Sequence, residues 1–176
     1  YYQLYGDREL KPIKEKKGGR KYIAQAINKS GSFLDFGCGN GFLLSELQQT
    51  SRIKIDPWGI DINKTRVEIA KNNFKKFKKQ FLSLEGNLSL NEEFKKINLF
   101  LKNKKFDYIH WNVWNSYIKK ALISEEKFLS NKCSIGIMVS FFKKYLKKKK
   151  KIIISLYPED AQLPIDNIFL KSLKTN

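Results

Sequence analysis

The sequence has 176 residues, of which 41% are hydrophobic and 14% aromatic, enough apolar material for the core of one domain. An excess of 35 basic over 17 acidic residues gives a formal charge of +18, which makes polyanions the first partners to consider. The chain lacks the run of about 18 apolar residues that a membrane helix needs. Its two cysteines, Cys38 and Cys133, have neither a disulfide-framework nor a metal-site spacing. We expect a single cytoplasmic domain over residues 1–176.

Apolar runs alternate with amphipathic stretches along the chain. A helical pattern in the basic N-terminal segment (1–30) comes first, over residues 16–28. Strands are then expected at 32–36, 57–61, 81–85, 106–111 and 152–157, and helices between them at 41–49, 64–77, 92–101 and 125–146. Because parallel neighbours need crossover connections, this order predicts a doubly wound parallel α/β sheet over 31–157, followed by a C-terminal segment over 158–176.

The first predicted strand runs directly into a glycine-rich turn, FLDFGCGNGFLL. Gly37, Gly39 and Gly41 between a strand and a helix let a ligand approach the main chain. The dinucleotide fingerprint G-x-G-x-x-G needs a glycine where this chain has Phe42, which argues against NAD and against a pyrophosphate. The second strand ends at Asp61, where a carboxylate can accept both hydroxyls of a ribose. The pattern indicates a nucleoside site without a phosphate clamp.

Each of these features also has a purely structural explanation. A glycine turn alone is usually a tight turn, and Asp61 alone could be a strand-end cap. Cys38 lies inside the turn with no base in sight, so we interpret it as a small residue that fits rather than as a nucleophile. The joint placement at two successive strand ends favours the functional interpretation.

The segments FLDFGCGNGFLL and WGIDINKTRVEIAKNNF resemble motifs I and II of the class I S-adenosylmethionine-dependent methyltransferases. LEGNL falls where that family has its adenine-contacting motif III, and FDYIHWN falls at motif IV. The similarity covers residues 30 to about 157. It implies a Rossmann-like enzyme that transfers a methyl group from S-adenosylmethionine, leaving S-adenosylhomocysteine, to an unidentified small-molecule or other acceptor.

The resemblance also implies which residues hold the cofactor. The glycine turn would line its methionine end, Asp61 would hold the ribose, and Asp35 would orient the amino group. Ile62 and Asn87 would flank the adenine, although the family usually has Asp at the position of Asn87. The expected cofactor-binding residues are Asp35, Gly37, Cys38, Gly39, Asn40, Gly41, Asp61, Ile62 and Asn87; no metal is expected.

The acceptor should lie at the carboxyl end of the fourth predicted strand. Methyl transfer from a sulfonium is an in-line displacement, so a base is needed only when the acceptor must lose a proton. His110 is a candidate general base there, although a hydrogen-bonded wall residue is an equally ordinary role, and Tyr117 and Tyr157 compete with it. The candidate acceptor-contacting residues are Trp111, Asn112, Trp114, Tyr157 and Arg20. Both tryptophans have a core position as their alternative.

Motif IV excludes two acceptor classes and leaves others open. The amino-group methylases of adenine and glutamine have an Asn-Pro-Pro-Tyr type sequence where this chain has NVWN, and the Pro-Cys of cytosine carbon-5 methylases is absent. Two further functions stay open: an RNA methyltransferase that uses the basic surface, and a nucleic-acid-binding domain that has lost turnover.

The end of the chain is short for the full family sheet of seven strands. Only 19 residues follow Tyr157, too few for a helix and the closing antiparallel hairpin. We therefore predict five parallel strands, with the last at an edge that needs cover from missing residues, from a helix or from a partner chain, such as a second copy in a homodimer.

Three lysine clusters precede the third, fourth and fifth predicted strands: Lys75, Lys76, Lys78 and Lys79; Lys102, Lys104 and Lys105; and Lys147 to Lys151. We expect all three at helix ends on the amino edge of the sheet, facing away from the cofactor. An N-terminal basic group is instead placed to meet an anionic acceptor: Lys11, Lys14, Lys16, Lys17, Arg20 and Lys21.

Overall fold

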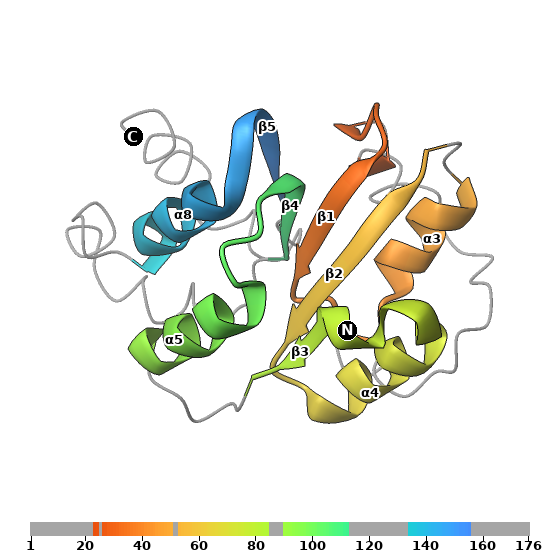
Figure 1. The fold of residues 1–176 in the computed structure, drawn as a ribbon, viewed down its shortest axis with the longest axis horizontal. Helices are drawn as coiled ribbons and strands as arrows, with labels where there is room; N and C mark the ends of the chain where they lie inside the picture. Colours follow the sequence, from red (N-terminus) through yellow and green to blue (C-terminus); the bar gives the residue numbers. More distant parts are fainter. Residues whose placement is uncertain (1–22, 25, 51–52, 85–89, 113–133, 156–176) are drawn as a thin grey trace, which may run out of the picture.

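The computed structural model describes residues 23–24, 26–50, 53–84, 90–112 and 134–155. Its centre is a sheet of five strands in the order β3-β2-β1-β4-β5, with every neighbouring pair parallel (Figure 1). The five parallel strands predicted from the sequence are confirmed within these residues. The strands are β1 (Gly31–Phe36), β2 (Ile55–Asp61), β3 (Phe81–Ser83), β4 (Phe106–Asn112) and β5 (Leu146–Ser155).

Helices cover both faces of this sheet, as a doubly wound fold requires (Figure 1). They are α3 (Phe42–Thr50), α4 (Lys64–Asn73), α5 (Leu90–Leu101) and α8 (Ser134–Tyr145), with a short 3₁₀ helix, η1 (Lys75–Gln80), ahead of β3. Side chains of β1 alternate between the faces: Phe33 packs in the core under α3 and α4, and Leu34 packs in the core under α5 and α8. Both are almost fully buried, which fixes β1 as the central strand.

The strand order reverses beside β1, because β2 follows on one side of it and β4 lies on the other. In open α/β sheets a reversal of this kind leaves a crevice at the carboxyl ends of the two central strands, where ligands bind. The fold therefore places the end of β1, the glycine turn and the end of β4 at one edge of the sheet.

The sequence prediction was wrong at the start of β5. A helix was expected to Leu146 and a strand only from residue 152, whereas β5 begins at Leu146 and contains the whole lysine run. The reason is tertiary: Lys147 and Lys150 form ion pairs with Asp107 on β4, so charged residues are stabilised in a strand. The predicted helical residues 125–133 lie outside the described residues.

Candidate functional site

The glycine turn is fastened to the end of β2 by main-chain hydrogen bonds. The N–H groups of Gly37 and Cys38 both donate to the carbonyl oxygen of Ile60, at 2.8 and 3.1 Å. Gly37, Gly39 and Gly41 all have positive φ angles, of 91°, 52° and 79°, which only glycine adopts readily. The local sequence therefore folds this way because each bend falls on a residue without a side chain.

The three glycines differ in what surrounds them. A Cβ atom at Gly41 would lie 2.9 Å from Phe74, the residue that follows α4, and one at Gly37 would lie 3.1 Å from Asn112 of β4. At Gly39 the nearest atom of the described residues is 4.0 Å away, on Arg66. Gly41 and Gly37 therefore serve packing, whereas Gly39 leaves space through which a ligand can reach the main chain.

Asp61 joins the carboxyl end of β2 to this turn. Its Oδ2 accepts a hydrogen bond from the N–H of Gly39 at 2.7 Å, and its Oδ1 accepts one from the N–H of Asn63 at 2.8 Å. The side chain is buried, and burial raises the pKa of Asp61 despite these two donors. Ile62, the next residue, is exposed and presents an apolar surface beside the carboxylate.

A second buried carboxylate lies at the end of β1, and it contacts the chain's only histidine. Asp35 and His110 are register partners on β1 and β4, and Oδ1 of Asp35 lies 2.7 Å from Nδ1 of His110. Both side chains are buried, with 2% and 4% of their areas exposed, and Phe33 stacks against the imidazole. The structure thus brings together a predicted cofactor residue and a predicted catalytic residue.

The other predicted site residues lie in different surroundings, and some lie outside the described residues. Asn40 accepts a hydrogen bond from the N–H of Phe42 and so caps the start of α3, and Asn112 lies beside Gly37. Trp111 is in the core against Phe142 of α8, with 1% of its area exposed. Trp111 therefore occupies the core position that was its alternative, and the expectation that it stacks on the acceptor is corrected. Outside the described residues lie Asn87, Trp114, Tyr117, Tyr157 and Arg20.

Cys38 occupies a closed space between the glycine turn and β2. Its sulfur would lie 2.8 Å from a Cβ atom at Gly59, and its side chain is buried. Burial, and then the nearby charges of Asp35 and Asp61, raise the pKa of the Cys38 thiol well above its ordinary value. A thiol held in this protonated form packs the site and does not act as a nucleophile.

The described residues contain neither a membrane-spanning helix nor a cluster of metal ligands. No helix there combines the length and the apolar character that crossing a lipid bilayer requires. Within the same residues, no three His, Cys, Asp or Glu side chains are grouped so that they could hold a metal ion.

Comparison with known proteins identifies the family. Residues 27–175 match the model of a family described as a methyltransferase domain. No curated protein matches the chain.

Among solved structures, a precorrin-6y C5,15-methyltransferase from Geobacter metallireducens GS-15 is 13% identical with a TM-score of 0.54, covering 94% of this chain and 76% of its own. TrmN from Thermus thermophilus is 14% identical with a TM-score of 0.50, and the match covers 77% of this chain and 35% of TrmN. A SAM-dependent methyltransferase from Geobacter sulfurreducens, in complex with S-adenosyl-L-homocysteine, is 15% identical with a TM-score of 0.45, covering 77% and 46%. This chain thus spans less than half of the latter two.

At such identities, the two structures with a TM-score of 0.50 or above show the fold and nothing further. The family match, by contrast, includes all five strands, the glycine turn and Asp61. The chain therefore belongs to the family of methyltransferase domains.

Proposed function

We propose that this domain transfers a methyl group from S-adenosylmethionine to an acceptor and binds the cofactor across the carboxyl ends of β1 and β2. The observation that carries the proposal is the 2.7 Å hydrogen bond from Gly39 to the buried carboxylate of Asp61, which sets a ribose-binding group against a bare stretch of main chain. Membership of the methyltransferase domain family supports the reaction class.

The described residues fit this cofactor. Each oxygen of Asp61 accepts one main-chain hydrogen bond, and a carboxylate oxygen can accept two, so both retain capacity for a ribose hydroxyl. The space at Gly39 admits the ligand to the main chain. The exposed side chain of Ile62 offers an apolar surface for the adenine, and the carboxylate of Asp35 can attract the amino group.

The sulfonium of S-adenosylmethionine supplies an activated methyl group with a neutral thioether as leaving group. The residues of this chain therefore have to align the cofactor rather than activate it. Asp61 fixes the ribose, and Asp35 places a negative charge at the end of β1, where His110 holds its carboxylate at 2.7 Å. A catalytic role for His110 or Tyr117 and acceptor contacts by Asn112 and Trp114 stay predictions.

The proposal predicts that Asp61→Ala weakens cofactor binding. Losing a charged acceptor of ribose hydroxyls should cost about 1.5–3 kcal/mol, or roughly 10- to 150-fold in Kd, in calorimetric titration with S-adenosylmethionine and S-adenosylhomocysteine. The matched control is Asp56→Asn, a carboxyl change at the opposite end of the same strand, which should leave the affinity unchanged. Thermal unfolding of both variants checks that they fold. Unchanged affinity in a folded Asp61→Ala protein would remove Asp61 from the site.

The acceptor is the part of the function to be identified by experiment. Extract fractions incubated with S-adenosylmethionine carrying a labelled methyl group, separated by size and then treated with nuclease or protease, would sort the product into small molecule, RNA or protein. Label in none of the fractions, with cofactor binding intact, would favour a domain that has lost turnover.

Two expectations about the cell and about partners also stay predictions, namely a cytoplasmic location and pairing of two copies through the last strand. The structure places β5 at the edge of the described sheet, where such pairing would occur. Lysines on an edge strand disfavour addition of a second strand, so the lysine run of β5 argues against this contact over its first half.

A further inference from the structure

The positive charge of the described residues is concentrated at the amino edge of the sheet. The segments that lead into the five strands, together with the first residues of β1, β2, β4 and β5, carry 15 lysines with described side chains and only two carboxylates, Asp56 and Asp107. The other described residues carry five basic and six acidic side chains, so they are close to neutral. The 15 are Lys29, Lys54, Lys75, Lys76, Lys78, Lys79, Lys102, Lys104, Lys105, Lys143, Lys144, Lys147, Lys148, Lys150 and Lys151.

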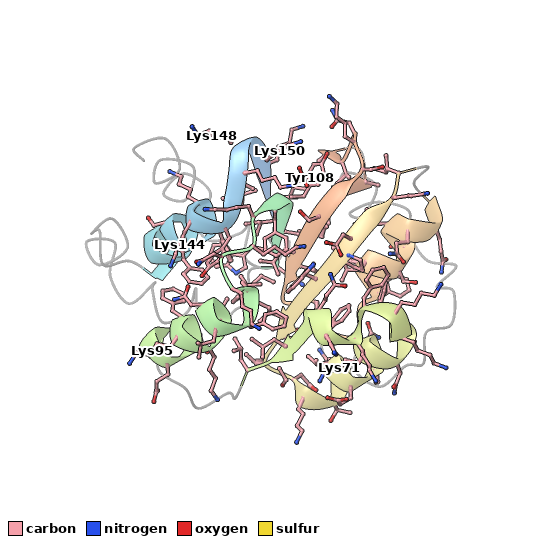
Figure 2. The ribbon with its side chains drawn as sticks, in the orientation of Figure 1. Lys71, Lys95, Tyr108, Lys144, Lys148 and Lys150 are labelled. Atoms are coloured by element: carbon pink, nitrogen blue, oxygen red, sulfur yellow. The ribbon has the colours of Figure 1, made fainter. Side chains whose placement is uncertain are left out.

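Two ordinary explanations do not account for this concentration. A composition rich in lysine would place lysines at both edges of the sheet, not at one. Stabilisation of helix C-termini, which also lie at the amino edge, concerns only the last turn of a helix. The lysine run 147–151 belongs to a strand, so no helix end explains it. Figure 2 shows Lys148 and Lys150 beside β5, whereas Lys71 and Lys95 lie on α4 and α5 at the other end of the view.

The two carboxylates at this edge are already occupied. Asp107 lies 2.7 Å from Nζ of Lys147 and 3.3 Å from Nζ of Lys150, and accepts hydrogen bonds from the main-chain N–H and the hydroxyl of Ser32. Asp56 lies 3.0 Å from Nζ of Lys104. Three lysines are thereby paired with these two carboxylates, so among the described residues the basic groups of this edge outnumber the acidic ones by 15 to two.

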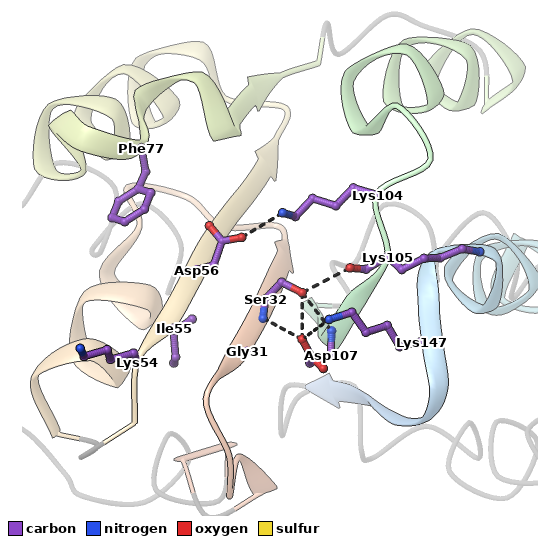
Figure 3. A pocket seen from close by; sticks show the side chains of 10 residues that line it. All are labelled: Gly31, Ser32, Lys54, Ile55, Asp56, Phe77, Lys104, Lys105, Asp107 and Lys147. Atoms are coloured by element: carbon purple, nitrogen blue, oxygen red, sulfur yellow. Dashed lines mark hydrogen bonds and ion pairs between the residues drawn. The ribbon is translucent and has the colours of Figure 1, made fainter.

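An open hollow of about 470 Å³ lies at this edge between the starts of β1, β2, β4 and β5 (Figure 3). Lys54, Lys104, Lys105 and Lys147 line it, together with the hydroxyl-bearing Ser32 and the two carboxylates Asp56 and Asp107. The four lysines come from three separate segments of the chain, so the fold brings them together at this edge. The ammonium groups of Lys104 and Lys147 pair with Asp56 and Asp107, and that of Lys105 donates to the carbonyl oxygen of Lys144.

We propose that the amino edge of the sheet, defined by these 15 lysines, docks the phosphate backbone of a nucleic acid. Lysine binds phosphate as a point charge, whereas the bidentate reading of bases favours arginine, of which the described residues contain only Arg66. The surface therefore fits the backbone rather than a base sequence. Its part at the starts of β1, β2, β4 and β5 is separated from Asp35 and Asp61 by about the length of a strand, 17–20 Å, so this part is a docking surface distinct from the cofactor site.

The test is fluorescence anisotropy of a labelled single-stranded RNA of about 20 nucleotides, with DNA of the same sequence as a second arm, in the absence of cofactor. The edge variant is Lys54→Gln with Lys148→Gln, and the control variant is Lys64→Gln with Lys95→Gln; all four lysines are exposed, and none of them takes part in the ion pairs of Asp56 or Asp107. We expect the edge variant to bind about tenfold more weakly at low salt, with its salt slope reduced by about 1.4 for two lost phosphate contacts. The control should change less than about twofold.

The outcomes decide between partner classes. Weaker binding of both RNA and DNA by the edge variant supports docking of the phosphate backbone, which the two nucleic acids share. If the wild type binds one of them more tightly, that one is the preferred partner. Equal losses in the two variants, or no binding of the wild type at low salt, would overturn the proposal. Tighter binding to phosphatidylserine vesicles or to polyglutamate than to either nucleic acid would overturn it as well. Because no cofactor is present, these results are independent of the proposed methyl transfer.

Discussion

The pairing of Asp35 with His110 changes how the histidine should be interpreted. The sequence makes His110 a candidate general base at an acceptor site, whereas the structure shows it buried, with Nδ1 against the carboxylate of Asp35. A neutral imidazole that donates its Nδ1–H leaves Asp35 negative and fixes its orientation. At the end of β1, an oriented negative charge suits the amino group of a cationic cofactor. We therefore propose that His110 acts through Asp35 as a positioning residue.

This assignment predicts that His110→Asn weakens S-adenosylhomocysteine binding more than 5′-methylthioadenosine binding, because the second ligand lacks the amino group. A hydrogen bond to a charged group is worth about 1.5–3 kcal/mol, which sets the expected difference. Asp35→Asn should show the same discrimination, and the double variant should lose little more, since the two residues act together. Competition titrations measure all four proteins. A variant whose turnover falls while both affinities stay constant would instead identify His110 as the general base.

At the scale of elements, the alternation of strands and helices could be predicted because each apolar run of the sequence is buried on the sheet. The glycine turn and Asp61 could be predicted as well, because their positions depend only on where an apolar run ends. The turn comes directly after β1, and Asp61 is the last residue of β2. The Asp35–His110 contact could not, because it depends on the register between β1 and β4, which lie 75 residues apart. Both residues are the fifth of their strands, and Ser32 and Asp107 are the second of theirs, so one register creates both contacts.

The start of β5 was the element that the sequence pattern misrepresented. Five consecutive lysines favour a solvated segment rather than a strand, and their pairing with Asp107 is visible only once β4 and β5 are side by side. Burial alone would raise the pKa of Asp107, but hydrogen bonds from Lys147 and Ser32 outweigh burial and hold that pKa far below its ordinary value. The carboxylate therefore favours the folded state and ties β1, β4 and β5 together.

Asp107→Asn should lower the free energy of unfolding by about 1.5–3 kcal/mol at pH 7, the value of hydrogen bonds to a charged group. Because the pKa of Asp107 is lower in the folded than in the unfolded protein, the wild type loses this stabilisation as the pH falls below about 4. The difference between wild type and variant should therefore shrink from pH 7 to pH 2.5 in urea unfolding. A difference that is independent of pH would show that packing, and not charge, determines the effect. Glu68→Gln, which removes an exposed carboxylate paired with Lys71 on α4, is the control.

At the scale of the whole molecule, the two edges of one sheet carry opposite electrostatic features. The carboxyl edge holds the buried carboxylates Asp35 and Asp61, which suit a cationic cofactor, whereas the amino edge carries the excess of lysines. A parallel sheet produces this separation because all strands start at one edge and end at the other. Residues that are scattered through the sequence thereby become two surfaces, about a strand length apart, with different ligand chemistry.

The crowded amino edge should make the stability of the free protein depend on salt. Two lysines about 10 Å apart in water repel each other by about 0.4 kcal/mol. We expect the sum over neighbouring lysines of this edge to outweigh the few ion pairs of Asp56 and Asp107. Added salt shortens the screening length from about 30 Å at 0.01 M to about 3 Å at 1 M, which weakens this repulsion more than it weakens contact ion pairs. We expect Tm to rise by several degrees between 0.01 and 0.5 M NaCl, as measured by circular dichroism. The Lys54→Gln, Lys148→Gln variant should start from a higher Tm and rise less, whereas the Lys64→Gln, Lys95→Gln variant should follow the wild type. A Tm that falls with salt would mean that the ion pairs, and not the repulsion, dominate this edge.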